Sequence, residues 1–338
     1  MRDGPPAHEG LVSSETYMNW EKGFKGLSIG FMAIGSATNL RSMMCSLIPN
    51  LPCSNSVPKL YSISYNYNIM LVGVLNSFTY DYTFRLRMGG INLNYFILEE
   101  TPISKLIIDK LVKLVFRFNG PNIIFSPYWL LVRDVNQNSL YSNWALTNQE
   151  RLRLWSIIDA IIAKLYFINY NDLSWILKND PTDPKGFWRV DKNIPQELRH
   201  TTLTLVAFRD LEKIIEENGG DVEKGIQAFC EQNDGEGWMI PEKIRFIQRE
   251  DGTLDFDTPD SVEYEVRSKL GPRFYDWQLE GTPEDSWKEC EMHARNILGD
   301  EEFEKFMKDL ENEGSSNKDN FHSGDETVQI KQRTLTEY

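Results

Sequence analysis

Long apolar runs, paired cysteines and clustered histidines are all missing from this chain of 338 residues. No stretch of about eighteen consecutive apolar residues occurs, so no membrane-spanning helix is predicted. The N-terminal residues also lack the apolar core of a secretory signal. The four cysteines form no C-x2-C pair and the four histidines form no metal-binding array, so a zinc site is not expected. We therefore expect free thiols, a cytoplasmic location and no metal.

The charge is divided unevenly along the chain. The whole chain has 36 Lys and Arg against 50 Asp and Glu, which gives a net charge of −14. Residues 1–200 hold 20 basic and 16 acidic residues, or +4, whereas residues 201–338 hold 16 and 34, or −18. A phosphate-contacting face is therefore compatible with the N-terminal part, while the acidic part disfavours tight DNA binding through charge alone.

Hydrophobic periodicity indicates helices mixed with a small sheet. Alternating polar and apolar residues at 61–69 predict a strand. Residues 71–87 have helical spacing, and this helix is expected to end at Gly89-Gly90, with residues 92–97 extended after it. The basic residues within 105–118 are interleaved with apolar ones, which fits either a phosphate-facing stripe or a solvated helix face.

The second half is predicted to begin with a helical hairpin. Thr147 and Glu150 have capping-box spacing ahead of a helix whose apolar face includes Trp155. Residues 171–177 predict the second helix of this hairpin. Farther along, residues 294–310 have the pattern of an acidic amphipathic helix.

Four blocks of sequence share their order and spacing with one protein family. The most informative block runs from Leu75-Asn76-Ser77 to Thr101-Pro102 and resembles the pattern LNS-x3-D-[FY]-x2-R-x-[RK]-x2-G-x3-N-[YF]-F-x4-P. Residues 34–49 resemble IA-x2-T-N-x-R-T-M … P, residues 151–177 resemble a segment containing LYGL, and residues 183–201 are similar to the stretch after it. These patterns are those of the TaqI-like specificity part of large adenine-specific DNA methyltransferases of bacterial restriction-modification and phage-defence systems.

The resemblance implies a target-recognition portion without its catalytic half. The family's F-x-G-x-G loop for S-adenosylmethionine and its N-P-P-[YF] motif for a flipped adenine are both absent. Ser126-Pro127-Tyr128-Trp129 is the nearest approach to the second motif, and it lacks the Asn and the second Pro. The implied partners are double-stranded DNA and a catalytic methyltransferase domain or subunit, which would carry the S-adenosylmethionine. No cofactor, catalytic residue or membrane contact is expected on this chain.

The DNA-contacting candidates are arginines, asparagines and lysines within or just after these blocks. Arginine can bind guanine and asparagine can bind adenine through paired hydrogen bonds in the major groove, and lysine can bind phosphate. A structural role is the alternative, because an arginine four residues after Asp81 could simply brace that carboxylate. Base readout would then come from loops such as Tyr61–Asn68 or Asn119–Asn122. The candidates are Asn39, Arg41, Arg85, Arg87, Asn92, Asn94, Lys105, Lys110 and Lys113.

The expected fold is α+β, with a small sheet and packed helices in the recognition part. The expected segments are a flexible N-terminus (1–18), a target-recognition domain (19–145), a helical domain completing the specificity region (146–218), an acidic, mostly helical extension (219–310) and a disordered tail (311–338). An alternative function remains open, in which the acidic part makes the chain a protein-interaction or regulatory subunit of a defence complex. A natural split subunit, a fragment and a decayed gene all fit the missing catalytic half.

Overall fold

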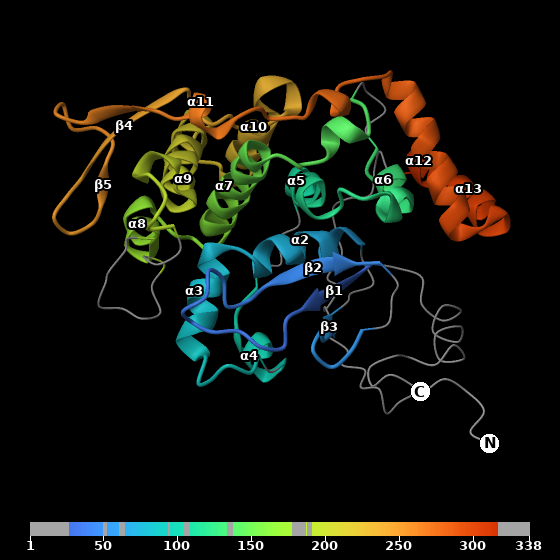
Figure 1. Cartoon of the computed structure of the whole chain (residues 1–338), viewed down its shortest axis with the longest axis horizontal. Coiled ribbons are helices and arrows are strands. Elements are labelled where there is room, and N and C mark those ends of the chain that lie inside the picture. The colour runs from blue at the N-terminus through green and yellow to red at the C-terminus, as the bar shows by residue number, and fades with distance from the viewer. Residues whose placement is uncertain are drawn as a thin grey trace.

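The computed structural model describes residues 27–49, 53–60, 65–93, 95–103, 108–133, 138–177, 187 and 191–316, with only the backbone of residues 65, 309 and 311–316. Helices dominate these residues, and two small antiparallel sheets accompany them (Figure 1). This confirms the α+β class predicted from the sequence. The predicted flexible N-terminus lies outside the described residues, as does the tail beyond residue 316.

The first sheet has the strand order β2-β1-β3 and lies against one helix. Strand β1 (Ser28–Phe31) pairs with β2 (Cys45–Ile48) and β3 (Lys59–Leu60), and all four of its residues are buried. Helix α2 (Tyr65–Leu75) covers the sheet, and Asn68 ties the two together by donating to the Leu27 carbonyl oxygen at 3.0 Å. The buried amide keeps the start of β1 hydrogen-bonded where water is excluded.

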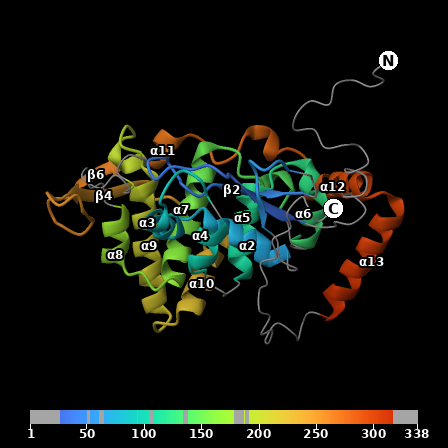
Figure 2. The same ribbon diagram turned by 90° about the horizontal axis from the view of Figure 1, so that it is seen from below.

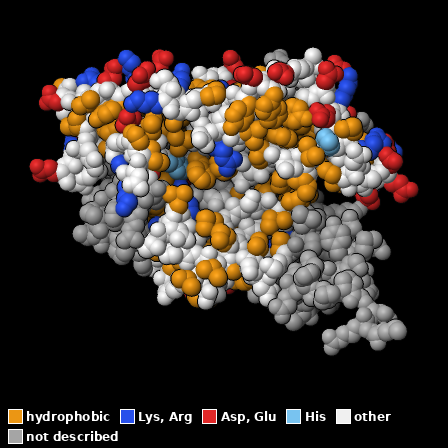
Figure 3. Space-filling view, in the orientation of Figure 1, with side chains coloured by type: hydrophobic (Ala, Val, Ile, Leu, Met, Phe, Trp, Pro, Cys, Tyr) orange, Lys and Arg blue, Asp and Glu red, His pale blue; other side chains and the backbone are white. Residues whose placement is uncertain are grey.

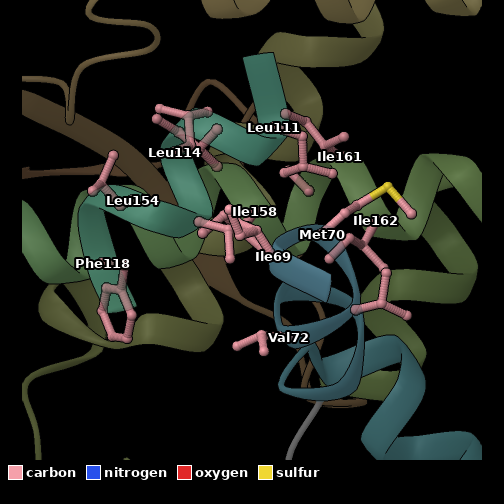
Figure 4. Packing of buried hydrophobic residues seen from close by; sticks show 14 of the residues in the cluster. Ile69, Met70, Val72, Leu111, Leu114, Phe118, Leu154, Ile158, Ile161 and Ile162 are labelled. Atoms are coloured by element: carbon pink, nitrogen blue, oxygen red, sulfur yellow. The ribbon is translucent and has the colours of Figure 1, made fainter. Parts of the chain in front are cut away.

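Helices α2, α5 (Asp109–Asn119) and α7 (Asn148–Leu165) form the centre of the core (Figure 4). Each fully buried aliphatic side chain there contributes about 1.5–3 kcal/mol to folding. Helix α7 also packs against α9 (His200–Glu217), which packs against α10 (Val222–Gly235). The labelled core residues are Ile69, Met70, Val72, Leu111, Leu114, Phe118, Leu154, Ile158, Ile161 and Ile162.

The remaining elements lie around this centre. Helices α3 (Phe78–Arg87), α4 (Tyr95–Glu100) and α8 (Tyr170–Leu177) lie on one side of it (Figure 1). The second sheet and the last two long helices occupy opposite ends of the molecule (Figures 1 and 2). These end elements are β4 (Lys243–Gln248), β5 (Leu254–Asp255) and β6 (Val262–Glu265) at one end, and α6 (Ser126–Leu131), α12 (Pro283–Leu298) and α13 (Asp300–Ser316) at the other. The short helix α11 (Arg267–Leu270) follows β6 and contacts α7.

The strand predicted over residues 61–69 is wrong in its described part, because residues 65–69 belong to α2. This helix is buried almost all round, so its apolar residues do not form the single stripe that marks an amphipathic helix. The loop Tyr61–Asn68, expected to read bases, is therefore not an exposed loop over its described residues.

The single helix predicted over residues 71–87 is two helices. The chain breaks at Ser77, whose hydroxyl caps α3 by accepting a hydrogen bond from the Tyr80 N–H at 3.2 Å. The predicted end before Gly89-Gly90 is confirmed, since α3 ends at Arg87. The extended segment predicted over 92–97 gives way to α4 at Tyr95.

The helical hairpin is confirmed, whereas the C-terminal half departs from prediction. Thr147 caps α7 by accepting from the Glu150 N–H at 3.2 Å, and α8 follows as the second helix. The acidic extension carries a sheet, its last predicted helix is divided at Gly299, and α13 continues to Ser316. The expected segments 19–145, 146–218 and 219–310 all contribute side chains to one apolar core.

Candidate nucleic-acid interface

A buried ionic clamp joins the first two sequence blocks. The Asp81 carboxylate accepts hydrogen bonds from the backbone N–H groups of Ser42 and Met43, both at 2.9 Å. Arg85 lies 2.8 Å from that carboxylate and donates to the carbonyl oxygens of Ala37 at 3.0 Å and Asn39 at 2.9 Å. The clamp therefore fixes the backbone of the 36–43 loop at residues 37 and 39 through Arg85 and at residues 42 and 43 through Asp81.

Arg41 extends this network to the third and fourth blocks. Its guanidinium lies 3.6 Å from the centre of the Phe78 ring and 3.7 Å from the Asp159 carboxylate. Asp159 in turn accepts from the Phe78 N–H at 2.6 Å and lies 2.9 Å from Nε2 of His200. Four segments far apart in sequence thus meet at one buried cluster of paired charges.

Burial sets the electrostatics of this cluster. It raises the pKa of Asp81 and lowers the pKa of Arg41, because both charged forms lose hydration, and the opposite charges offset part of that effect. Removing one partner from such a buried pair costs about 3–5 kcal/mol, since the other charge is left uncompensated.

Arg41 and Arg85 therefore do not fit the expectation that they contact DNA. Their side chains are only 4% and 1% exposed, and each is occupied by carboxylates and carbonyl oxygens. The alternative role, in which Arg85 braces Asp81 at an i, i+4 spacing, agrees with the geometry. Asn94 and Lys105 lie outside the described residues.

Three of the candidates remain exposed around the clamp: Asn39, Arg87 and Asn92, which we name the recognition rim. Asn39 lies on the loop that Arg85 holds, and Arg87 ends α3. Asn92 forms a bridge to Ile34, so the two loops lie side by side. The rim thus combines guanidinium and amide groups on a backbone that the clamp has already ordered.

Apolar side chains surround the recognition rim. Figure 3 shows apolar side chains exposed across one face of the molecule, including the part that α3 and α4 form. A contiguous apolar patch rimmed by polar residues is typical of a binding surface. The exposed apolar residues of α3, of α4 and of the segments 32–40 and 88–92, each between 47% and 60% exposed, are Met32, Ile34, Leu40, Leu86, Ile91 and Phe96.

Lys110 and Lys113 lie elsewhere, beside a recess of about 520 Å³ between α5, α10 and α12. They are three residues apart on α5, so both lie on one face of the helix. The basic stripe predicted from the sequence therefore borders a concavity rather than an open helix face. Asp234 and Glu236 line the same recess as these lysines, which the sequence did not predict. Their glycines, Gly235 and Gly237, do predict the turn in which they lie.

A second buried charge cluster fixes the base of this recess. Glu150 is fully buried and pairs with Arg153 at 2.5 Å, Arg273 at 2.8 Å and Arg117 at 3.2 Å. Burial alone would raise the pKa of Glu150, but the hydrogen bonds and charges of these arginines hold it at about 2. Glu150, at the N3 position of the predicted capping box, thus links α7 to α5 and to the segment that carries Arg273.

Comparison of the chain with protein-family models, with curated proteins and with solved structures finds no match. No helix within the described ranges is long and apolar enough to cross a membrane. Among the residues whose positions are described, no group of three or more His, Cys, Asp or Glu side chains is placed to hold a metal ion.

Proposed function

We propose that this chain is the DNA target-recognition portion of an adenine-specific DNA methyltransferase of a restriction-modification or phage-defence system. In this proposal the recognition rim binds duplex DNA and positions it for a separate catalytic domain or subunit that carries S-adenosylmethionine. The four sequence blocks support the family assignment. The exposed amide and guanidinium groups of the recognition rim support the DNA contact.

One observation carries the proposal: the clamp orders the backbone beneath the rim and leaves the rim side chains in solvent. The Arg85 side chain is buried and donates a hydrogen bond to the Asn39 carbonyl oxygen at 2.9 Å, so it orders the loop beneath the rim. The Asn39, Arg87 and Asn92 side chains therefore project from a pre-ordered support. Pre-ordering reduces the entropy lost on binding, and amide and guanidinium groups match the hydrogen-bonding edges of adenine and guanine.

The test is binding of the full chain to a pool of DNA duplexes with a randomised centre, followed by anisotropy titration of the selected duplex. Arg87→Ala and Asn92→Ala are expected to weaken binding about 5- to 100-fold, as loss of base contacts does. Arg87 is exposed, so the variant is expected to keep its melting temperature. Lys213→Ala, on the exposed face of α9 with its side chain 76% exposed, is the charge-matched control for Arg87→Ala.

Selection of no duplex at low salt would refute the proposal. Equal weakening by Lys213→Ala and Arg87→Ala would also refute a specific role for the rim, because it would mean that only net charge matters.

The exposed apolar residues around the rim favour a second candidate, a protein-interaction module without DNA contact. Salt separates the two functions. A DNA complex weakens steeply between about 50 and 200 mM salt, whereas an apolar protein interface does not. A complex with a methyltransferase subunit that persists at high salt, together with no DNA binding, would establish this second function instead.

A further inference from the structure

Bulky apolar side chains gather where the segment before α12 contacts the 3-10 helix η2 (Tyr141–Asn143). Three of them come from residues 275–279, in and around the 3-10 helix η4 (Asp276–Gln278), and each is between 46% and 62% exposed. The Trp277 ring lies at a steep angle to the half-buried Tyr141 ring, with 5.6 Å between their centres. We name this set the aromatic patch, and its residues are Tyr141, Tyr275, Trp277 and Leu279.

A buried glutamine holds the segment that carries the aromatic patch. Gln278 is fully buried, and its amide group donates to the carbonyl oxygens of Tyr141 at 2.8 Å and Trp144 at 2.9 Å. Its side-chain oxygen accepts a hydrogen bond from the Tyr275 N–H at 3.1 Å. The backbone of the segment is thus fixed from beneath, and the Tyr275 and Trp277 rings stand on an ordered support. A partner that contacts them does not have to order the segment first.

Negative charge surrounds the aromatic patch. Residues 275–289 hold five acidic residues and one lysine, which gives a net charge of −4. The lysine, Lys288, already lies 2.7 Å from the Glu284 carboxylate. Burial and the hydrogen-bonded Glu289 carboxylate both raise the pKa of the Tyr141 hydroxyl, so a negative charge lies beside that ring as well. The patch therefore favours a positively charged partner.

The two acidic residues nearest to Trp277 in the sequence are available to such a partner. Asp276 comes directly before Trp277 and Glu280 comes three residues after it, and both are exposed. Within the described part of the chain, neither carboxylate forms an ion pair or a hydrogen bond. A cation that lies over the indole ring is attracted by the ring itself, and here it also finds unpaired carboxylates.

We propose that the aromatic patch binds an arginine-containing segment of a partner protein, with a guanidinium group over Trp277 and paired with Asp276 or Glu280. Arginine fits better than lysine, because its planar group both stacks on aromatic rings and forms paired hydrogen bonds with carboxylates. Tryptophan, tyrosine and arginine are also the residues that dominate binding energy at protein interfaces. The patch shares no residue with the recognition rim and does not depend on the proposed DNA binding.

The test is an anisotropy titration of a short labelled peptide of Arg-Gly-Ser repeats with the full chain, and a Gln-Gly-Ser peptide is the neutral control. Saturable binding of the arginine peptide is expected, with none of the glutamine peptide. Trp277→Ala is expected to weaken binding about fivefold or more, as loss of a central interface residue does. Asp276→Asn combined with Glu280→Gln is expected to weaken it to a similar degree. All three side chains are exposed, so these variants are expected to keep their melting temperature.

The chain offers a matched control for each variant. Trp175 is 55% exposed and lies edge-on to Tyr82 with 5.8 Å between ring centres, so Trp175→Ala removes a similar ring from another surface. Asp260→Asn combined with Glu216→Gln removes two exposed charges, one between β5 and β6 and one on α9. Neither control is expected to change binding of the arginine peptide, because its residues lie outside the patch.

The proposal is overturned by an absence of saturable arginine-peptide binding, by equal binding of the glutamine peptide, or by equal weakening in the control variants. A dimer of the chain that Trp277→Ala dissociates would also overturn it, because the patch would then bind a second copy. The Arg87→Ala variant is expected to bind the arginine peptide normally. Failure of the proposed DNA function and failure of this site therefore give different results.

Discussion

Phe167 occupies a backbone position that normally requires glycine. Helix α7 ends with the Ile168 N–H bonded to the Ala163 carbonyl oxygen at 3.1 Å and the Phe167 N–H bonded to that of Lys164 at 3.0 Å. This pair of bonds is the Schellman arrangement, whose central residue is left-handed and usually glycine. Phe167 has φ 59° and a side chain that is 94% exposed.

Replacing Phe167 by Gly is expected to stabilise the protein. The left-handed backbone costs a non-glycine residue about 1–2 kcal/mol, and glycine removes that cost. Glycine also makes the unfolded chain more flexible, which subtracts about 0.5–1 kcal/mol. The exposed ring buries almost no area, so its loss removes little hydrophobic stabilisation. The net expectation is a gain of about 0.5–1 kcal/mol in the free energy of unfolding.

Helix α9 provides a matched control within the same chain. It ends in the same arrangement, with the Gly219 N–H bonded to the Glu216 carbonyl oxygen at 3.0 Å and the Gly220 N–H to that of Ile215 at 2.9 Å. Gly219 has φ 74°, and a Cβ added there would meet no atom within 4 Å. Gly219→Ala is therefore expected to lose about 1 kcal/mol through backbone strain alone.

Urea denaturation of Phe167→Gly, Phe167→Ala and Gly219→Ala tests this reasoning. Phe167→Ala keeps the Cβ and is expected to leave the midpoint nearly unchanged, whereas Phe167→Gly should raise it. If Phe167→Gly instead destabilises the chain by more than about 0.5 kcal/mol, the ring stabilises the fold and the strain argument is wrong.

Three further predictions concern the buried network. Arg85→Ala is expected to lower the free energy of unfolding by about 3–5 kcal/mol, because it leaves the buried Asp81 charge without its partner. Arg87→Ala, two residues away, should change this free energy by under about 0.5 kcal/mol. Similar melting curves for the two variants would contradict the clamp. Glu150 has a pKa of about 2, below the ordinary 4.5 of the unfolded chain, so its stabilisation of about 3 kcal/mol is complete above pH 4.5 and lost as the pH falls toward 2. Glu150→Gln should therefore be less stable at pH 7 and show a flatter pH dependence below 4.5, and an unchanged slope would exclude this role. Trp155→Ala is expected to cost about 3 kcal/mol, because the partly buried ring stacks between Phe118 and His200 at 4.9 and 5.2 Å, and a loss under 1 kcal/mol would refute its packing role.

Local chemistry was enough to predict several helix ends. Thr147 at the start of α7 acts through a hydrogen bond within the first turn, and α3 ends just before the Gly89-Gly90 pair, where Met88 is already extended. Helix α2 could not be predicted this way. Its burial on nearly all sides is set by the sheet, α5 and α7, and the alternating Tyr61, Ile63, Tyr65 pattern favoured a strand.

The candidate site was only partly predictable, because its burial also depends on residues distant in the sequence. A sequence can place Arg85 four residues after Asp81, but it cannot say whether that pair faces solvent or the core. The partners that bury the pair, the 36–43 loop and Phe187, are distant in the chain. For Phe167 a local signal existed, because the resembling LYGL segment has glycine where this chain has phenylalanine.

The clamp also explains what kind of information the sequence blocks contain. Asp81, Arg85, Arg41 and Asp159 come from three of the blocks, and all four are buried against one another. The buried positions of the pattern specify a support, since each is fixed by a partner inside the same chain, whereas Asn39 and Arg87 are pattern positions that stay exposed. Residues that read a DNA sequence must instead face outward, as the rim residues do. If the proposed function holds, exchanging the exposed Asn92 for another polar residue is expected to alter the selected duplex before it alters the melting temperature.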